Sequence, residues 1–530
     1  MKNTLIKVSF LFFFFNINTG FSQEFKRGNN WTIGFVPGVV FNFNAGLSID
    51  TFEHLVGMQS CSCISDTNGG LLFFNGGWFL GDRNGYLMEN GNDVNCPKGT
   101  VLADYYGGGS LFTQTSIILP KKGNTYYVFS TGMSDSSANI YLNHIDTKFD
   151  VLNYSIVDMD SNAGKGKVTV KNKILMDHQE YANCALTAVR HGNGKDWWLL
   201  KADCYHNRFQ LFLVQEDTIL GPYYQYSTDT SVYCHTLGQI YFSQDGSKLA
   251  ASVFGGRYYD TSSISYLPGN VKQMYQGVMY VPNRVDLYNF DRCNGAITYK
   301  NFYVTPYDTS SYPYADVKDG ICFSPNGNLL YMSNMYTIYQ IDLTDTNKSN
   351  ALFITGPDTT IAQFPWYSEM ACGPDGRLYI GTFSGSNYMS YIADPNVQGP
   401  GCNFTPHGIW QPYTGLQDPP NMPNYGLGAA PVGGNCWPLA VDQLNSREIR
   451  PLNIYPNPAS DKIDIQYVLD EYEQADLIFY DMLGNKVKVV KLHGNVFAKT
   501  IYVGDLASGL YVYHFNTTKG KRYVGKLIIE

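Results

Sequence analysis

The stretch Phe323-Ser324-Pro325-Asn326-Gly327-Asn328-Leu329-Leu330-Tyr331-Met332 is the part of the chain that decides its fold. A polar turn stands directly before a run of apolar residues. Asn-Gly favours a tight turn because both residues tolerate the positive φ angles that such a turn needs. The stretch is therefore predicted to be a β-hairpin that joins two buried strands.

The same combination of a turn and an apolar strand recurs along the body of the chain. The other copies lie at residues 64–74, 119–129, 189–200, 242–251 and 372–380. A second apolar unit often follows, as at residues 285–291 and 338–343. Two hairpins make a four-stranded sheet, and such sheets repeated at roughly 50–80 residues are typical of a β-propeller.

The repeats predict an all-β body, a six- or seven-bladed β-propeller over about residues 30–425. An early apolar run, residues 31–35, is expected to close the ring by joining the last blade. The longest gap between turns contains residues 255–276, which are interpreted as a loop insertion within a blade. The composition agrees with an extracellular β-protein rich in turns, because charged residues make up only 15% while Gly and Tyr number 52 and 42.

Three segments of the body also resemble parts of known propellers. The Phe-Ser-Pro-Asn-Gly-Asn-Leu-Leu-Tyr motif resembles the blade signature of WD-repeat-like and TolB-like propellers. Residues 65–73 and 375–380 are similar to segments of the propeller regions of Bacteroidetes surface proteins. This resemblance implies a fold and leaves the activity open, since one fold hosts many functions.

The last eighty or so residues have a different texture, opening with Ile454-Tyr455-Pro456-Asn457-Pro458-Ala459-Ser460-Asp461. Proline fixes φ and biases the residue before it to an extended conformation. Short alternating runs with turn signals between them follow. They predict about six or seven strands of a small C-terminal β-sandwich.

This block resembles the type A C-terminal sorting domain of the type IX secretion system of Bacteroidetes. The resemblance implies an export address that is recognised by the outer-membrane translocon and removed by its sortase-like peptidase. The cargo is then released or joined to surface lipopolysaccharide. The residues that carry the sorting motif are Tyr455, Pro456, Asn457, Pro458, Asp481, Gly484, Gly509, Tyr511 and Lys526.

The other end of the chain fits the same route. Lys2 and Lys7 precede an apolar run, and Gly20-Phe21-Ser22 places small residues where a signal peptidase cleaves. The predicted order is a signal peptide (1–22), a β-propeller (23–425), a linker (426–451) and the sorting domain (452–530). The protein is expected to pass through the periplasm and to be secreted or held on the cell surface.

Charge and cysteine content narrow the partners and the bonds. A net charge of -8 gives no electrostatic support to nucleic-acid binding. Eleven cysteines all lie between Cys61 and Cys436, and export favours disulfides. The candidate pairs are Cys61 or Cys63 with Cys96, Cys184 with Cys204, and Cys402 with Cys436. The odd number leaves at least one thiol unpaired.

The sequence shows no catalytic set, so the catalytic residues stay unknown. It lacks the HExxH, Gly-x-Ser-x-Gly and Walker motifs, and its turns depart from the sialidase Asp-box. Residues 158–164 and 342–347 carry alternating oxygen ligands but lack the Gly and Glu spacing of a calcium loop, so polar turns are expected. His178 with Glu180, His206 near Asp203, and His235 are expected to be ordinary loop residues. No metal and no cofactor is predicted.

Aromatic pairs supply the last candidates for a binding surface. Loop aromatics stack on sugars, whereas aromatics within strands pack between blades. The pairs are Tyr105-Tyr106, Trp197-Trp198, Tyr223-Tyr224, Tyr258-Tyr259 and Trp366-Tyr367, of which Trp197-Trp198 is expected to be core.

The leading functional hypothesis is a non-enzymatic surface propeller that binds an extracellular glycan or protein, for example in adhesion. One alternative is a secreted polysaccharide hydrolase or lyase on the same scaffold. Another is a purely structural component of a surface layer.

Overall fold

The structure is a computed structural model of the chain. It describes most of the body and of the C-terminal block. The described residues are 24–34, 38–52, 62–106, 114–142, 149–177, 185–203, 208–226, 238–253, 256–258, 273–275, 278–281, 284–304, 320–334, 337–345, 351–355, 367–382, 386–415, 418–431, 436, 452–455, 457–467, 469, 474–493, 498–520 and 522–530. The predicted signal peptide and most of the predicted linker lie outside these residues.

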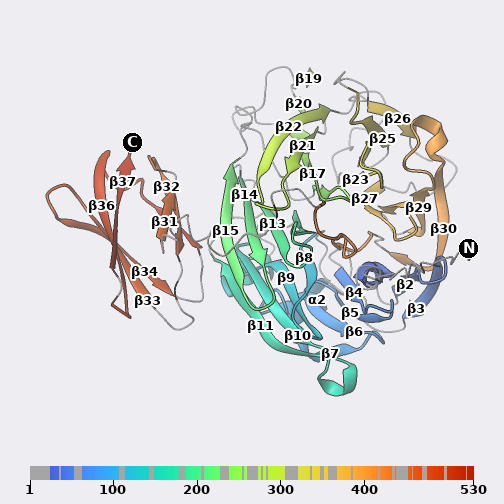
Figure 1. The fold of residues 1–530 in the computed structure, drawn as a ribbon, viewed down its shortest axis with the longest axis horizontal. Helices are drawn as coiled ribbons and strands as arrows, with labels where there is room; N and C mark the ends of the chain where they lie inside the picture. The colour runs from blue at the N-terminus through green and yellow to red at the C-terminus, as the bar shows by residue number, and fades with distance from the viewer. Residues whose placement is uncertain are drawn as a thin grey trace, which may run out of the picture.

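The body is built from small antiparallel sheets that follow one another along the chain (Figure 1). The first three sheets are β1 (Asn30–Gly34), β2 (Gly38–Asn42) and β3 (Ser48–Phe52); β4 (Ser62–Ser65), β5 (Leu71–Asn75), β6 (Phe79–Asp82) and β7 (Leu87–Asn92); and β8 (Ser116–Pro120), β9 (Thr125–Gly132), β10 (Val151–Asp158) and β11 (Lys167–Met176). The second and third of these sheets are linked by a single residue pair between β7 and β11.

Four further sheets of the ring have four strands each in the described residues. They are β12 (Leu186–Arg190), β13 (Trp197–Asp203), β14 (Arg208–Val214) and β15 (Ile219–Tyr226); β16 (Ile240–Phe242), β17 (Lys248–Val253), β21 (Arg284–Phe290) and β22 (Ile297–Val304); β23 (Ile321–Phe323), β24 (Leu329–Asn334), β25 (Thr337–Asp342) and β26 (Ala351–Thr355); and β27 (Tyr367–Cys372), β28 (Leu378–Thr382), β29 (Ser386–Ile392) and β30 (Phe404–Gly415).

The predicted hairpin turns are confirmed. Each of the six repeated turns joins the first two strands of a sheet, and each contains a glycine with positive φ. These glycines are Gly69, Gly123, Gly194, Gly246, Gly327 and Gly376. In the turn between β23 and β24, the Ser324 hydroxyl accepts a hydrogen bond from the Leu329 amide (2.9 Å) and donates to the Asn326 side chain (2.8 Å). The local turn chemistry therefore fixes where each sheet begins.

The sheets form a propeller-like ring. In each case the first strand of a sheet contacts the first strand of the next, and Figure 1 shows these strands toward the centre with the last strands outside. The contacts run in the order β1, β4, β8, β12, β16, β23 and β27. Cores of buried aliphatic and aromatic side chains lie between neighbouring sheets.

Buried glutamines join the inner strands. The side-chain oxygen of Gln239 accepts hydrogen bonds from the backbone amides of Ile321 (2.8 Å) and Met370 (3.1 Å). Its side-chain nitrogen donates to the backbone carbonyl of Met370 (2.8 Å). The Gln114 side chain makes both bonds to the backbone of Ile240, each at 2.9 Å. Since buried polar groups need partners, these side chains hold inner strands of different sheets in register.

The ring does not close as predicted. The expectation that residues 31–35 join the last sheet is wrong, because β1 pairs with β2 in a sheet of its own and β30 occupies the outer position of the last sheet. Closure comes from side-chain packing. Trp31 and Phe43 lie edge-on to Tyr379, with ring centroids 5.2 and 5.5 Å apart. A hydrophobic cluster thus joins the two sheets without sharing a strand.

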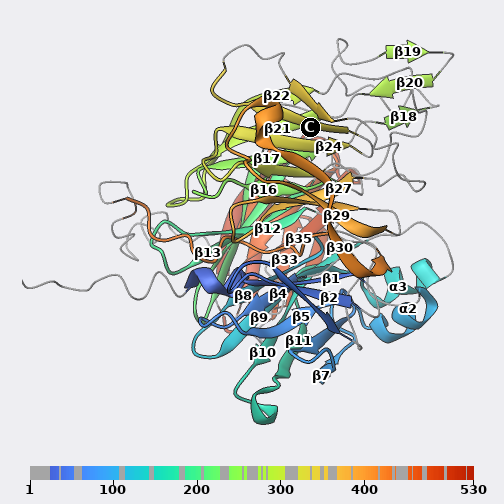
Figure 2. The same ribbon diagram turned by 90° about the vertical axis from the view of Figure 1, so that its right-hand side faces the viewer.

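The predicted insertion is present in one sheet. It lies between β17 and β21 and contains an antiparallel sheet of its own, formed by β18 (Gly256–Tyr258), β19 (Gln273–Tyr275) and β20 (Val278–Val281). Figure 2 shows these strands projecting away from the ring.

Short helices decorate the ring. They are η1 (Phe25–Gly28), α2 (Gly99–Tyr106), α3 (Asp135–Leu142), η2 (Asn162–Gly164) and η6 (Gly399–Cys402). Figure 2 shows η1, in dark blue, on one side of the ring and α2 and α3 on the other. No helix among the described residues has the length and apolar character needed to cross a membrane.

Residues 418–431 cross the centre of the ring after the last sheet (Figure 1). The Asn421 side-chain amide donates to the backbone carbonyls of Ser116 and Leu186, both at 2.8 Å. The buried Tyr425 hydroxyl donates to a carbonyl of β8 (2.8 Å). This central segment is thus packed where the sequence predicts the end of the propeller and the start of a loose linker.

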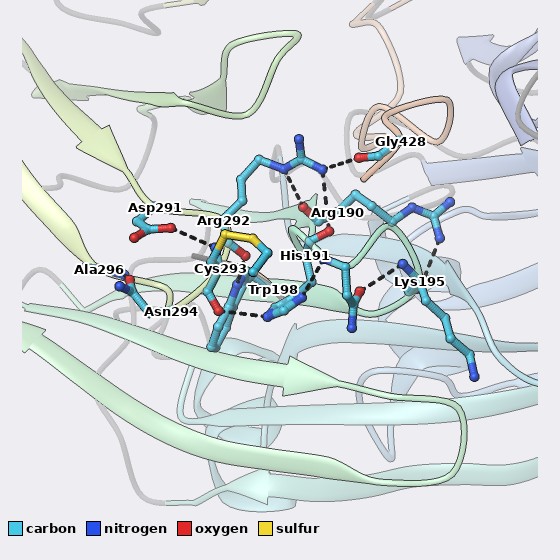
Figure 3. Close-up of a disulfide and its surroundings, with 12 residues drawn as sticks. Arg190, His191, Lys195, Trp198, Asp291, Arg292, Cys293, Asn294, Ala296 and Gly428 are labelled. Carbon is cyan, nitrogen blue, oxygen red and sulfur yellow. Dashed lines mark hydrogen bonds between the residues drawn. A yellow bond between two sulfur atoms is a disulfide. The ribbon is translucent and has the colours of Figure 1, made fainter. Parts of the chain in front are cut away.

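A disulfide anchors the chain just beyond the central segment (Figure 3). It joins Cys293 and Cys436, whose Cα atoms are 4.9 Å apart and which are separated by 143 residues. Next to it, the Arg292 guanidinium donates to the carbonyls of Arg190 (2.8 Å) and Gly428. The bond therefore ties the chain beyond the central segment to the sheet that carries the insertion.

Two of the predicted cysteine pairings are wrong. Cys402 lies in η6, between the last two strands of the last sheet, and is a buried free thiol. Cys436, which follows the central segment, is bonded to Cys293 instead. Cys96 is also buried and free, so it pairs with neither Cys61 nor Cys63. The predicted pair of Cys184 with Cys204 lies outside the described residues.

The C-terminal block is a separate body with its own core (Figure 1). Its seven described strands form two sheets, as the sequence predicts for a small sandwich. They are β31 (Leu452–Tyr455), β32 (Lys462–Tyr467) and β35 (Ala498–Tyr502) in one sheet, and β33 (Gln474–Tyr480), β34 (Lys486–His493), β36 (Gly509–Thr517) and β37 (Arg522–Ile529) in the other. One residue pair, Met176 with Ala498, links it to the body.

Removing the long-range disulfide is expected to destabilise the ring. Closing a loop of 143 residues contributes on the order of 5 kcal/mol in the chain-entropy account. The Cys293→Ser/Cys436→Ser variant should therefore unfold at a clearly lower temperature than the unaltered chain in calorimetry without reductant. Cys372→Ser, at a half-buried free thiol, serves as the control and should shift the midpoint little. Equal midpoints for the double variant and the unaltered chain would contradict the anchoring role.

Candidate binding site

The structure does not describe the histidines that the sequence offered as catalytic candidates, so their roles stay predictions. His178, Glu180, His206 and His235 lie outside the described residues. Within the described parts, no three His, Cys, Asp or Glu side chains gather as a metal site would require. Burial raises the pKa of Cys63 to about 11 and that of Cys96 to about 12, so both remain neutral thiols and poor nucleophiles.

The acidic loops considered for calcium are turns stabilised by their own carboxylates. The Asp158 carboxylate accepts bonds from the Asp160 amide (3.0 Å) and the Ser161 hydroxyl (2.9 Å). The Asp342 carboxylate accepts from the Thr344 amide (2.8 Å) and hydroxyl (2.6 Å). Both acidic segments are thus polar turns in the residues that the structure describes, as the sequence predicts.

The aromatic pairs divide between core and surface. Trp197 and Trp198 are both buried, which confirms the prediction that they pack in the core. Tyr223 is partly exposed and lies edge-on to Trp198, with ring centroids 6.1 Å apart. The side chains of Tyr105, Tyr106 and Tyr258, together with Tyr259 and Trp366, lie outside the description. Trp410, on β30, is an exposed aromatic that the sequence did not single out.

A pocket with a volume of about 340 Å³ lies beside the central segment. The third and fourth sheets of the body, residues of η1 and residues 425–427 line it. Its basic groups are Arg27, Lys121, Arg190 and Lys195, and its acidic groups are Glu24 and Glu216. The volume falls within the range of small-molecule sites, which begins at roughly 300 Å³.

Arg190 is the buried centre of this basic pocket, with only 7% of its surface exposed. Its guanidinium stacks 3.9 Å from the ring centroid of Trp197 and donates to the Tyr425 carbonyl (3.0 Å). It also donates to the Lys195 carbonyl (3.1 Å), as Figure 3 shows. Among the described residues, its Nε has no hydrogen-bond partner. Burial lowers the pKa of Arg190, and Glu24 opposes that effect, so the group stays cationic at neutral pH.

Both carboxylates of the pocket are engaged in ion pairs. Glu24 lies between the two arginines, 2.9 Å from Arg27 Nε and 3.4 Å from a terminal nitrogen of Arg190. At the rim, Glu216 lies 3.3 Å from Lys195 Nζ. Both carboxylates are therefore already committed to neighbouring cations. Lys121 also pairs with Asp217 beside the pocket (3.0 Å), so the four basic groups exceed these three carboxylates by one positive charge, which suits the pocket to an anion.

A second, smaller pocket lies on the other side of Tyr425. Its volume is about 70 Å³, and its walls include Phe25, Trp31, Tyr241 and Met422. This space holds little more than water. Of these two pockets, the basic one alone reaches the size of a small-molecule site.

Few features of the sequence point to this site. Residues 420–427 look like a linker because they are rich in Pro, Asn and Gly, and residues 24–27 look like the start of the mature chain. The one local signal is the pair Trp197-Trp198, which follows the turn Gly192-Asn193-Gly194-Lys195-Asp196. This signal predicts that Trp197 lies in a hairpin, but it does not predict that Arg27 and Tyr425 lie beside it.

The sorting-motif residues have structural roles within the sandwich. The Asn457 side chain donates to the Lys526 carbonyl (2.8 Å) and accepts from the Ile528 amide (2.9 Å), which ties the start of the block to its last strand. The Tyr511 hydroxyl donates to the Ala507 carbonyl (2.6 Å), two residues before Gly509 begins β36. Pro458 follows Asn457, Tyr455 ends β31, and Pro456 lies outside the described residues.

Asp481 and Gly484 shape the turn between β33 and β34. The Asp481 carboxylate accepts from the amides of Leu483 (2.9 Å) and Asn485 (2.8 Å). Gly484 has a φ of 82°, which favours glycine. The motif residues of the block thus include several that stabilise its fold.

Comparison with solved structures returns matches at low similarity. The extracellular domain of a putative hybrid two-component system from B. thetaiotaomicron is 9% identical, with a TM-score of 0.32; the alignment covers 95% of this chain and 56% of that one. A protein from Lactobacillus plantarum (9% identity, 74% and 98% covered, TM-score 0.38) and a putative 6-phosphogluconolactonase from Bacteroides uniformis (14%, 74% and 90%, 0.28) also match. The chain thus spans little more than half of the first of these, and the scores are too low to transfer a function.

No curated protein matches the chain. A family model does match its end: residues 453–530 fit the family described as "Secretion system C-terminal sorting domain". The C-terminal block is therefore a sorting domain of the type IX secretion system, and it directs the chain to the cell surface or into the medium.

Proposed function

We propose that the chain is an exported binding protein whose ring holds an acidic saccharide in the basic pocket. The observation that carries this proposal is the combination of a concave volume of about 340 Å³ with four basic side chains, one of them buried. A carboxylated, sulfated or phosphorylated sugar unit matches both the size and the charge. A protein partner would instead bind a flatter and larger surface.

The ion pairs of the pocket support binding more than hydrolysis. A glycosidase needs two carboxyl groups with separate roles, one of them protonated. Here Glu24 is held by Arg27 and Arg190, and Glu216 by Lys195. A hydrolase or lyase on this scaffold would need acids other than these two.

We also infer that the ring is a seven-bladed propeller, with each of the seven consecutive sheets as one blade. The chain of contacts between first strands supports this count, as does the aromatic cluster that joins the last sheet to the first. The first blade would then have three described strands and the other six four. The basic pocket lies between the third and fourth of these blades and the central segment.

The export route has a direct test. Because a single residue pair joins the sorting-domain strands to those of the body, we infer that the body folds without residues 452–530. Deleting residues 452–530 should leave a folded protein in the periplasm of a bacterium with a type IX system, measured by fractionation and immunoblotting. Arrival of the truncated protein at the surface would contradict the proposed route.

Acidic-saccharide binding is tested on an array of neutral and charged glycans, followed by calorimetry with the best ligand. Lys121→Gln/Lys195→Gln should weaken binding about tenfold or more, because each lost charge contact is worth about 1 kcal/mol. Lys122→Gln is the matched control, since Lys122 pairs with the same Asp217 as Lys121 but does not line the pocket. Equal losses for control and double variant, or preference for neutral glycans, would contradict the proposal.

Ionic strength gives an independent prediction. Rim charges exposed to solvent are screened at high salt. The affinity for a charged glycan should therefore fall steadily between about 50 and 500 mM salt, and fall less steeply in Lys121→Gln/Lys195→Gln. A salt-independent affinity would show that apolar contacts, and not the basic pocket, hold the ligand.

A further inference from the structure

The turn between β33 and β34 of the sorting domain is rigid. The Asp481 carboxylate accepts from two turn amides and from the Asn485 side chain (3.0 Å). The Asp481 amide donates to the Asn485 carbonyl, and the Gly484 amide to the Asp481 carbonyl, both at 3.0 Å. The turn therefore holds one conformation and fixes the direction of the two side chains at its tip.

Those two side chains are Met482 and Leu483, and they face solvent. Met482 is 66% and Leu483 88% exposed, more than any other large apolar residue in the described parts of the chain. Neither belongs to the core of the sandwich. Apolar groups exposed on a rigid turn add nothing to folding, and exposed apolar patches commonly mark interaction sites.

The apolar surface continues along the neighbouring strand. Val487 and Val489 on β34 are also exposed, and β34 is an edge of its sheet. Lysines flank these valines, and one of them, Lys488, pairs with Asp505 (2.7 Å). The tip is thus an apolar projection with a basic border.

The sorting-motif residues Asn457 and Tyr511 direct their polar groups to the backbone of the block itself. They build the domain and leave recognition to its surface. The part of the export machinery that recognises a sorting domain must contact exposed groups, and the tip is the most exposed apolar feature that this domain offers.

We propose that the Met482–Leu483 tip inserts into an apolar pocket with an acidic border on the export machinery. Asp481 and Gly484 then act as positioning residues, because they hold the turn from which the tip projects. This inference is independent of the proposed function of the ring, since it concerns a different part of the chain.

The test uses the full-length chain in a bacterium with a type IX system, with surface and periplasmic fractions quantified by immunoblotting. Met482→Ser/Leu483→Ser should reduce the surface and medium fraction at least tenfold, with uncleaved protein accumulating in the periplasm. Met482→Leu/Leu483→Met, which keeps the apolar tip, should restore export. Export of the serine variant at the unaltered level would overturn the proposal.

A matched control separates the tip from general surface change. Val524→Ser/Ile528→Ser removes two exposed apolar side chains (59% and 43% exposed) from β37 of the same domain and should export normally. Its failure to the same extent would also overturn the proposal, because export would then follow exposed apolar area in general. Thermal unfolding of the purified variants should match the unaltered chain, and a serine variant whose sorting domain is unfolded would assign the turn to folding instead of docking.

Discussion

The packing of Trp31 and Phe43 around Tyr379 is the contact on which the ring depends. A ring of sheets has two free ends, and here no strand is shared between the first sheet and the last. Edge-to-face aromatic contacts contribute about 0.5–1.5 kcal/mol each beyond their burial. Side-chain packing alone must therefore resist opening, and other links across the ring become important.

The central segment supplies those links. Asn421 bonds to the third and fourth sheets, Tyr425 to the third, and the disulfide at Cys436 to the fifth. A short piece of chain thus spans sheets that do not neighbour one another. The same segment forms a wall of the basic pocket, so the stability of the ring and the shape of the site share one element.

The hairpins could be predicted because their causes are local. Asn-Gly and Asp-Gly at Gly246, Gly327 and Gly376 require positive φ wherever they occur, and the apolar runs beside them can only be strands. The first sheet lacked such a turn and was assigned to the wrong place. The sandwich was predicted for the same reason as the hairpins, through alternating runs between glycine turns.

The site escaped prediction because its causes are not local. Glu24, Arg190 and Tyr425 come together only when the ring is closed and the central segment crosses it. The pairing of Cys293 with Cys436 is hidden in the same way, since Cys402, which is nearer in sequence to Cys436, is buried in a hydrophobic cluster at the last two sheets.

The position of the central segment in the chain has a consequence for export. The ribosome makes every sheet of the ring before it makes residues 418–431, and the sorting domain comes after both. A chain cut short before its centre is filled therefore also lacks its address. A sorting domain at the C-terminus therefore restricts export to chains whose body has been synthesised in full, because shorter chains lack the domain that the export machinery recognises.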